Sequence, residues 1–329
     1  MKKYNVLGIG NAVVDVISQS SDLFLEKMDI EKGIMQLVDR DRGELLYNSM
    51  DNRKQAPGGS VANTIAGIGK LGLKTGFIGK VGNDELGVFY RDTMEENGTN
   101  FVNNLMVKSE LPTSRSMIFV SDDGERSMNT YLGISAELGP EDVNLEVAAS
   151  ADIVFVEGYL FDKDKGKEAF IKLAKECRAA GGLSGIAISD PFCVERHRAD
   201  FLSLIKNELD YVIGNKEEIM ALFETDNFES ALSKAVDISP LVVCTRSSEG
   251  VTAIQEGNRV DFRVEPVIPV DATGAGDQFA AGFLYGLATH ANLETACSMG
   301  CLCAEEVIGH IGPRPQIRLL DKFSEMKLI

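Results

Sequence analysis

A short stretch near the end of the chain, DATGAGDQFAAGFLYGL at residues 271–287, combines groups that could bind a phosphate with groups that could accept a proton. Gly274 and Gly276 let the backbone turn sharply and approach a ligand closely, because no bulky side chain intervenes. The apolar residues that follow fall on one face of a helix: Phe279, Phe283, Leu284 and Leu287. Residues 274–277 are therefore expected at a helix N-terminus, where unpaired N–H groups and the helix dipole favour an anion.

Asp277 stands in the first turn of this expected helix, beside the anion site. In the simpler interpretation the carboxylate only caps the helix or favours its dipole. In the other interpretation it is a general base, which takes the proton of a substrate hydroxyl as that hydroxyl attacks phosphorus. The neighbouring N–H groups would then stabilise charge on the transferred phosphoryl group, and Thr273 would add a hydroxyl donor. The residues alone leave both interpretations open.

The composition excludes several classes of partner. The 329 residues carry a formal net charge of −17, which would repel nucleic acid and acidic membrane surfaces. No segment approaches the roughly 18 apolar residues of a membrane span. The apolar N-terminal run is broken by Asn11 and Asp15, which favours a first strand over a signal peptide. The cysteines stand in apolar or helical settings, which indicates reduced thiols, and we expect a cytoplasmic protein that acts on small molecules and binds neither nucleic acid nor membrane.

Several stretches partly match nucleotide-binding or metal-binding motifs, but their position or spacing does not fit such sites. GIGKLG at residues 67–72 matches G-x-G-x-x-G but ends a helical pattern, whereas a dinucleotide site follows a strand and opens a helix. GIG at residues 8–10 does follow a strand, but Val13 occupies the third glycine position. Leu71, which follows Gly69 and Lys70, rules out a P-loop. The histidines lack metal-ligand spacing, so a dehydrogenase, a P-loop ATPase and a zinc enzyme are all disfavoured.

Short apolar runs alternate with amphipathic stretches along most of the chain. The runs expected as strands are residues 4–10, 74–82, 152–158, 185–190, 211–215 and 241–246. The stretches expected as helices are residues 60–72, 84–98, 165–181 and 216–224. This alternation predicts an α/β fold with a doubly wound, mostly parallel sheet and helices on both of its faces. Ligands of such sheets bind beyond the carboxyl ends of the strands.

Two regions depart from this rhythm. Residues 15–50 are loosely patterned, and residues 113–132 are typical of a hairpin that turns at the Asp-Asp-Gly of residues 122–124. We expect these two regions to form a small β-rich lid laid on the main sheet. Residues 1–14, 51–112 and 133–329 would then form the large part, which carries most of the binding groups.

Three motifs, in this order of residues, resemble those of the ribokinase-like (PfkB) carbohydrate kinases. PGGSVAN at residues 57–63 resembles the family's N-terminal Gly-Gly signature, NKEE at residues 215–218 its N-x-x-E motif, and DATGAGDQFAAGF its C-terminal signature. The last motif is highly specific, N-x-x-E alone is weak, and the resemblance covers nearly the whole chain. It implies the ribokinase-like fold and an enzyme that moves the γ-phosphate of ATP to a hydroxyl group with the help of Mg²⁺.

The resemblance assigns roles to the residues at matching positions. Asp277 matches the catalytic base, and the matching anion hole is formed by Gly274, Ala275 and Gly276. Residues that match substrate contacts are Asp15, Gly58, Gly59 and Asn63. Residues that match ATP contacts are Asn215, Glu218, Thr245, Gly250, Thr273, Gly274 and Gly276, with Glu218 expected to reach Mg²⁺ through water. Arg126, in the expected hairpin, would act in catalysis by neutralising phosphoryl charge, and Asp271 resembles the K⁺ site of some members.

Several of these assignments have a structural alternative in the residues themselves. Asp15 could be a turn residue, Glu218 a solvated first-turn carboxylate and Arg126 an exposed hairpin charge. The sequence also departs from the family pattern at two places. Ala272 replaces the usual Thr, which removes a hydroxyl contact, and Thr-Arg-Ser at residues 245–247 replaces Thr-x-Gly in the nucleotide loop. The second departure concerns how the nucleotide packs, not whether one is used.

The phosphate acceptor is less clearly indicated. GIGNAVVDVI, with Asn11 before Asp15, and the segment around Arg126 resemble adenosine kinases more than ribokinases. Candidate purine contacts are Met35, Phe119 and Tyr159, although core packing would also explain them. Glu157 could instead hold a free sugar hydroxyl, as in a kinase of ribose, fructose or 2-keto-3-deoxygluconate. A third alternative is a catalytically silent nucleotide-binding regulator, and the oligomeric state is either monomer or homodimer.

Overall fold

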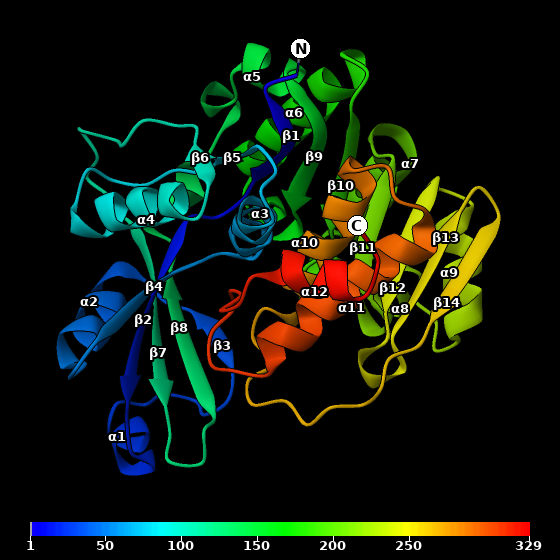
Figure 1. Cartoon of the computed structure of the whole chain (residues 1–329). Helices are drawn as coiled ribbons and strands as arrows, with labels where there is room; N and C mark the ends of the chain where they lie inside the picture. Colours follow the sequence, from blue (N-terminus) through cyan, green and yellow to red (C-terminus); the bar gives the residue numbers. More distant parts are fainter. Residues whose placement is uncertain (1) are drawn as a thin grey trace.

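Nine strands form the larger of two sheets in the computed structural model, which describes residues 2–329 (Figure 1). Their order is β14-β13-β12-β11-β10-β9-β1-β5-β6. The bounds are Tyr4–Ile9 (β1), Thr75–Ile78 (β5), Thr99–Phe101 (β6), Ala151–Glu157 (β9), Leu183–Ala187 (β10), Tyr211–Asn215 (β11), Leu241–Thr245 (β12), Val251–Gln255 (β13) and Asn258–Phe262 (β14). Neighbouring strands from β12 to β6 are parallel, and β13 and β14 add an antiparallel edge. The mostly parallel sheet and the strands expected in it are thus confirmed.

Helices cover both faces of this sheet, because alternate residues of each strand point to opposite sides. Val154 and Val156 of β9 join one buried cluster, whereas Ile153 and Phe155 join the other. The first cluster is covered by α5 (Leu145–Ala149), α6 (Asp164–Ala179), α7 (Pro191–Glu208), α8 (Lys216–Leu222) and α9 (Phe228–Val236). The second is covered by α3 (Ser60–Lys70), α4 (Glu85–Glu96), α10 (Ala275–Ala288) and α11 (Leu293–Ile308). The expected helices are confirmed, with small differences at their ends.

A second sheet forms the lid, seen at the lower left of Figure 1. Its order is β3-β8-β7-β2-β4, and its strands are β2 (Val13–Gln19), β3 (Met35–Leu37), β4 (Lys54–Gly58), β7 (Ser114–Val120) and β8 (Arg126–Tyr131). The expected hairpin is present, since β7 and β8 pair antiparallel on either side of residues 121–125. The helices α1 (Asp22–Lys27) and α2 (Arg40–Ser49) pack on this sheet, where Leu25 and Leu46 share a buried cluster with Met117.

The lid sheet takes more of the chain than the expected division allots to it. Its strand β2 starts at Val13 and β4 ends at Gly58, although residues 1–14 and 51–112 are expected in the large part. The run KQAPG of β4 carries no strand signal, because it has no β-branched or aromatic residue and ends in Pro-Gly. It lies at the edge of the sheet, where a proline is tolerated. The division into a large part and a lid stays a prediction, but the strands place its boundaries before Val13 and after Gly58.

The strand order reverses near the centre of the large sheet. From β1 the chain adds β5 and β6 on one side, and from β9 it adds β10, β11 and β12 on the other. The crevice at such a reversal is where ligands bind in open α/β sheets. Asn11 follows β1, and Glu157 ends β9, while Asn215 and Thr245 end β11 and β12. The fold therefore brings these polar side chains to one edge of the sheet.

The remaining elements are short. The helix α12 (Leu319–Glu325) packs on α10 and α11, and 3₁₀ turns occupy Gly133–Glu137, Pro140–Asp142, Gly158–Asp162 and Ser247–Glu249. All six cysteines are free, in agreement with the expected reduced thiols. Within residues 2–329, no helix combines the length and the apolar character that crossing a bilayer requires.

Candidate active site

Three cavities lie in a row at the carboxyl ends of the strands. The first, here named the lid cavity, has a volume of about 720 Å³ and lies between the lid strands and the ends of β1 and β9. The second, the central cavity, measures about 290 Å³, and the third, the outer cavity, about 270 Å³. Ser60 lines both the lid and the central cavity, whereas Thr245 and Gly276 line both the central and the outer cavity. The three cavities therefore adjoin, and a pair of ligands could meet between them.

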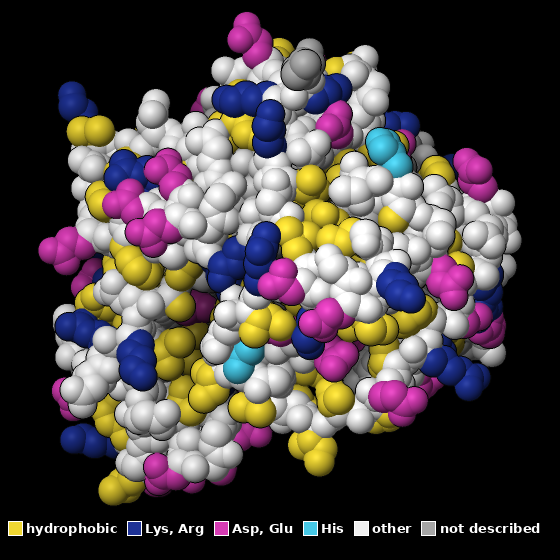
Figure 2. Space-filling view, viewed as in Figure 1, with side chains coloured by type: hydrophobic (Ala, Val, Ile, Leu, Met, Phe, Trp, Pro, Cys, Tyr) yellow, Lys and Arg dark blue, Asp and Glu magenta, His cyan; other side chains and the backbone are white. Residues whose placement is uncertain are grey.

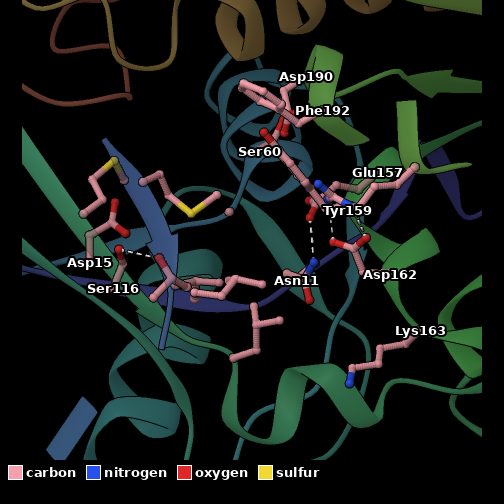
Figure 3. A pocket seen from close by; sticks show the side chains of 18 residues that line it. Asn11, Asp15, Ser60, Ser116, Glu157, Tyr159, Asp162, Lys163, Asp190 and Phe192 are labelled. Carbon is pink, nitrogen blue, oxygen red and sulfur yellow. Dashed lines mark hydrogen bonds and ion pairs between the residues drawn. The ribbon is translucent and has the colours of Figure 1, made fainter. Parts of the chain in front are cut away.

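The lid cavity has polar groups on several sides and an apolar lining between them. Figure 3 shows Asp15 and Ser116 of the lid on one side, and Glu157, Tyr159 and Asp162 on the other. The apolar lining consists of Val13, Met35, Leu37, Met128, Leu132, Tyr159 and Phe192. Figure 2 shows hydrophobic side chains gathered in a hollow where the lid meets the C-terminal half of the chain. The cavity can thus contact a ligand that is partly polar and partly apolar.

Asp15 lies on β2, and strand pairing determines where its carboxylate sits. Its neighbour in the lid sheet is β4, which runs antiparallel and ends at Gly58. A Cβ atom on Gly58 would lie 2.6 Å from Asp15 Oδ1, so only glycine leaves room for the carboxylate in this position. Burial raises the pKa of Asp15 to about 7, against the opposing charges of Arg314 and Arg126. The structure thus brings Asp15 and Gly58 together and supplies a reason for this glycine.

Glu157 makes contacts that the sequence did not indicate. Its Oε1 accepts hydrogen bonds from Asn11 Nδ2 at 2.9 Å and Asn11 N at 3.3 Å, and its Oε2 accepts one from Val61 N at 3.2 Å. Because Val61 is in the first turn of α3, the carboxylate ties this helix to the loop after β1. Burial raises the pKa of Glu157 to about 7, although these hydrogen bonds oppose the shift. Both oxygens of Glu157 thus have a structural role, and its contact with a sugar hydroxyl stays a prediction.

Asp277 reaches the start of α3, whose N-cap is Gly59. Ser60 Oγ donates to Asp277 Oδ1 at 2.7 Å, and Asn63 Nδ2 donates to Oδ2 at 3.0 Å. The side chain lines the central cavity, next to its junction with the lid cavity at Ser60. Burial raises the pKa of Asp277 to about 6, although Asn63, Ser60 and the charge of Arg314 lower it. A carboxylate with a pKa near neutrality at the junction of two cavities is suited to accept a proton.

The two glycines of the DATGAGD motif have different surroundings. Gly274 is the N-cap of α10 with a φ of 81°, and a Cβ atom there would lie 2.6 Å from Pro313 Cα. This left-handed, tightly packed position requires glycine. Gly276 has no atom within 4 Å of its Cβ position and lines the central and outer cavities. The backbone at Gly276 is thus open to a ligand, at the N-terminus of a helix that favours anions, as expected for residues 274–277.

Asn215 and Glu218 form a capping box at the start of α8. Asn215 Oδ1 accepts from Glu218 N at 2.8 Å, and Glu218 Oε2 accepts from Asn215 N at 2.9 Å. Both line the central cavity, and burial raises the pKa of Glu218 to about 7, so this is not a solvated surface glutamate. Residues 2–329 contain no group of three or more His, Cys, Asp or Glu side chains arranged for a metal. The pair fits a Mg²⁺ ion that is held mainly by phosphate and water oxygens.

Arg126 extends from the lid to the loop before α10. Its Nη2 lies 2.8 Å from Asp271 Oδ2, and its Nη1 lies 3.4 Å from Thr273 Oγ1. Asp271 also accepts hydrogen bonds from Thr273 N at 3.0 Å and Gly312 N at 2.9 Å. Burial favours a higher pKa for Asp271, but these hydrogen bonds and Arg126 outweigh burial and lower the pKa. Arg126 is therefore not a free hairpin charge, and the K⁺ site expected at Asp271 stays a prediction.

The outer cavity is mostly apolar. Its apolar lining consists of Val264, Pro266, Val267, Pro269, Ala272, Ala275, Phe279, Cys301, Ala304 and Ile308. Thr245 and Gly250 lie at its polar margin, together with Ser247. Ser247 also lines the central cavity, so the departure from Thr-x-Gly places a hydroxyl where the two cavities meet. An apolar cavity next to an anion site suits a molecule with a flat base and phosphates.

Comparison with known proteins agrees with this geometry. Residues 33–318 match the pfkB family carbohydrate kinases. The chain belongs to this family. Its structure matches that of a probable sugar kinase from Rhizobium etli CFN 42 with a TM-score of 0.92 and 41% identity, over 100% of both chains. It matches an adenosine kinase from Sinorhizobium meliloti with a TM-score of 0.90 and 42% identity, over 98% of this chain and 99% of that one.

Among curated proteins, a fructokinase from Klebsiella pneumoniae is 29% identical over 75% of this chain and 82% of its own length. The PfkB chain is therefore a sugar or nucleoside kinase whose acceptor group is a hydroxyl, and the ribokinase-like fold is confirmed. The family implies ATP as phosphate donor and Mg²⁺ as its companion ion.

The structure brings most of the expected residues of this PfkB kinase to the lining of the three cavities. The expected residues that line none of them are Gly58, Asn63, Phe119, Arg126, Asp271, Thr273 and Gly274. Phe119 is fully buried, and its ring centroid lies 5.5 Å from that of Phe24 on α1. It lines none of the three cavities, because its side chain points to the face of the lid sheet that packs on helices. The other two candidate purine contacts, Met35 and Tyr159, do line the lid cavity.

Three residues that carry later arguments are among those of the site that have no role in the sequence-based assignment. Ser60 lies inside the PGGSVAN motif. Its position as the first hydroxyl side chain after the glycines is the signal that the sequence offers. Phe192 follows Pro191 at the start of α7 and is 73% exposed, which no periodicity indicates. Arg314 lies in the run GPRP at residues 312–315, where a cation between two prolines is the only signal.

Proposed function

We propose that this PfkB kinase transfers the γ-phosphate of ATP to a primary hydroxyl group of a nucleoside, with adenosine as the favoured acceptor. The observation that carries the proposal is the two-part character of the lid cavity. Its polar group Ser60 donates a hydrogen bond to Asp277, Asp15 faces the same cavity from the lid, and the apolar lining continues from the lid strands to Phe192. A nucleoside has the same two parts, a hydroxylated ribose and a flat, largely apolar base.

The size of the cavity and its aromatic lining favour a nucleoside over a bare sugar. Its volume of about 720 Å³ is within the roughly 300–1,000 Å³ of pockets that hold drug-sized ligands. Phe192 is 73% exposed beside the cavity, and Tyr159 lines it as well. A base could stack on such rings, which would remove their apolar faces from water. Met35 and Leu37 of β3, which are 49% and 55% exposed, could cover the base from the lid side.

In the proposed reaction, the hydroxyl oxygen forms a bond to the γ-phosphorus, and the bond from that phosphorus to the bridging oxygen of ADP breaks. Asp277 accepts the hydroxyl proton at its carboxylate. The open backbone at Gly276 and the N-terminus of α10 stabilise charge on the phosphoryl group, and Arg126 adds a positive charge from the lid. Asn215 and Glu218 would hold Mg²⁺ through water, and this ion, when bound, neutralises phosphate charge.

The positions of the cavities support this division of roles. The apolar outer cavity suits the base of ATP, and the central cavity suits its phosphates, because Gly276 and Asn215 line the latter. Along its length, the nucleotide would contact Thr245, Gly250 and Thr273. The acceptor hydroxyl would enter from the lid cavity near Ser60, where the two substrates would meet at Asp277.

A free-sugar kinase is the second candidate, and named relatives support it. The curated proteins similar to this chain include a fructokinase and a 5-dehydro-2-deoxygluconokinase, each 29% identical. A sugar would use Asp15, Asn11 and Ser116 and would leave the apolar lining uncovered. A catalytically silent regulator is disfavoured, because such a protein has no need of an Asp277 carboxylate aligned by two donors.

The test is ADP release with ATP and Mg²⁺ against adenosine, other nucleosides, ribose, fructose and 2-keto-3-deoxygluconate, each with and without K⁺. We expect adenosine to give turnover well above that of any free sugar, and little dependence on K⁺ because Arg126 already engages Asp271. Turnover with a free sugar alone would overturn the nucleoside assignment. It would leave the roles proposed for Asp277 and the anion site unchanged. ATP binding without turnover on any acceptor would support the regulator.

A further inference from the structure

Arg314 lies at the active site without an assigned role. It stands in the segment between α11 and α12, which packs against the start of α10 at Gly274. Gln278 and Lys70 hold this segment by donating to the backbone carbonyls of the two residues that flank Arg314, at 3.0 Å and 2.7 Å. The backbone is thus held on both sides of Arg314, which limits the positions that its side chain can reach.

The Arg314 side chain determines the orientation of the Asn63 amide. Arg314 Nε donates to Asn63 Oδ1 at 3.1 Å, and Asn63 Nδ2 donates to Asp277 Oδ2 at 3.0 Å. Arginine can only donate hydrogen bonds, and an ionised carboxylate can only accept them. The amide oxygen must therefore face Arg314 and the amide NH₂ must face Asp277. This arrangement favours the ionised form of Asp277, since Oδ2 already accepts a hydrogen bond.

The charge of Arg314 acts on the same carboxylate. Within residues 2–329 its hydrogen-bond partners are Asn63 and Met94 Sδ, and its Nη1 is buried without a partner. Its positive charge is therefore not taken up by a hydrogen-bonded carboxylate. The charged groups that face Asp277 are Arg314, Asp15 and Glu157. Of these three, Arg314 carries a positive charge and the other two are acids. Accordingly it lowers the pKa of both Asp277 and Asp15, which burial raises.

We propose that Arg314 is a positioning residue for phosphoryl transfer: through Asn63 it holds the Asp277 carboxylate in place, and its unpaired charge keeps that carboxylate ready to accept a proton. The inference rests on the proposed function, in which Asp277 is the base. Asn63 then acts on Asp277, which differs from the sugar contact that the resemblance implies for it.

The experiment compares Arg314→Met with Lys70→Met in the full-length protein, with kcat and KM measured by ADP release across the pH range around neutrality. The native acidic limb of kcat/KM is expected at a pKa of about 6, because protonation of Asp277 below that pH removes the base. Arg314→Met should lower kcat roughly 10- to 100-fold and move this limb to higher pH, with little change in the KM for ATP. Lys70→Met loosens the same segment without touching Asn63, and it should leave the limb at the native pH.

Arg314→Lys separates the charge from the geometry. Lysine keeps the charge but lacks the Nε–H that fixes Asn63, so kcat should fall while the limb stays near its native pH. If Arg314→Met does not fold, judged by its melting temperature, Arg314→Lys alone carries the test, and native kcat in it overturns the proposal. If Arg314→Met folds and keeps the native acidic limb of kcat/KM, the proposal is overturned as well. The same holds if Lys70→Met shifts this limb as much as Arg314→Met does.

Asp277→Asn is measured alongside to separate this proposal from the one on which it rests. Near-native turnover in Asp277→Asn removes the base assignment itself, and the role of Arg314 with it. Inactive Asp277→Asn together with native behaviour in Arg314→Met removes only the role of Arg314. Inactive Asp277→Asn with a shifted limb in Arg314→Met supports both.

Discussion

The lid cavity and the central cavity adjoin, but the chain builds them in different ways. The phosphate end of the central cavity, Gly276 and Asp277, comes from one run of seven residues, and its capping box comes from residues 215–218. The lid cavity is lined from the loop after β1 and from β2, β3, β7, β8, β9 and α7. Groups in one short run keep their geometry through the local backbone, whereas groups from many segments meet only once the whole chain has folded. The anion site and the expected base, at Gly276 and Asp277, are thus local in the sequence. Their partners Arg126, Asn63 and Arg314 and the groups for choosing the acceptor come from distant segments.

Replacing Asp277 by Asn should have the largest effect and should act through the central cavity. The amide keeps the size of the side chain but cannot take the proton, so kcat should fall by about 10²- to 10⁴-fold. ATP binding should survive, because the backbone at Gly276 is unchanged. Single-turnover ADP release and calorimetry with ATP provide the two measurements. Near-native turnover would mean that this carboxylate only ties α10 to the start of α3.

Replacing Asp15 by Asn should act on the lid cavity instead. Hydrogen bonds to a charged group are worth about 1.5–3 kcal/mol, so the KM for the acceptor should rise roughly 10- to 150-fold. The KM for ATP should hardly change, because Asp15 lines only the lid cavity among the three. Steady-state kinetics with both substrates varied give the two constants. An equal rise in both would contradict the division of the site into two functional ends.

The same contrast explains how much of the fold could be predicted. The central strands are buried on both faces and read as continuous apolar runs, so residues 211–215 were expected as a strand and form β11 with the same bounds. The strand β4 has no such signal in KQAPG, and its conformation depends on pairing with β2 across the lid. Local pattern therefore predicts the large sheet well and the lid sheet poorly.

Within the site, residues in one motif were predicted together and long-range partners were not. The DATGAGD motif places Asp277 at the start of a helix, which α10 confirms. Its donors Ser60 and Asn63 lie 217 and 214 positions away in the chain, and Arg314 lies 251 positions from Asn63. No spacing rule connects residues at such separations. They become neighbours only because α3, α10 and the segment after α11 pack together.

Replacing Gly274 or Gly276 of the DATGAGD motif by Ala tests the phosphate end of the site without changing the lid cavity. Gly274→Ala would force a Cβ against Pro313 at a φ of 81°, so the free energy of unfolding should fall on the order of 1–3 kcal/mol. Gly276→Ala meets open space and should keep native stability, but the new methyl group would narrow the cavity and raise the KM for ATP. Urea unfolding and ATP kinetics of both variants distinguish the two outcomes. Equal destabilisation by both would remove the distinction between a packed and an open glycine.

Replacing Phe192 by Ala should have the smallest effect, and it tests the acceptor most directly. The ring is 73% exposed, so its loss leaves no buried void and should not change the melting temperature. A stacked aromatic pair is worth about 0.5–1.5 kcal/mol, so the KM for adenosine should rise roughly 2- to 12-fold. The KM for a free sugar should stay the same, because a sugar has no flat base to stack.

The matched control for Phe192→Ala is Val107→Ala, since Val107 is 75% exposed and lines none of the three cavities. It should change neither constant. A native KM for adenosine in Phe192→Ala would mean that the base of the nucleoside does not bind against α7. A rise for adenosine and sugar alike would mean that the ring shapes the cavity without recognising a base. A rise for adenosine alone would show that a residue 85 positions before Asp277, outside every motif, helps to choose the acceptor.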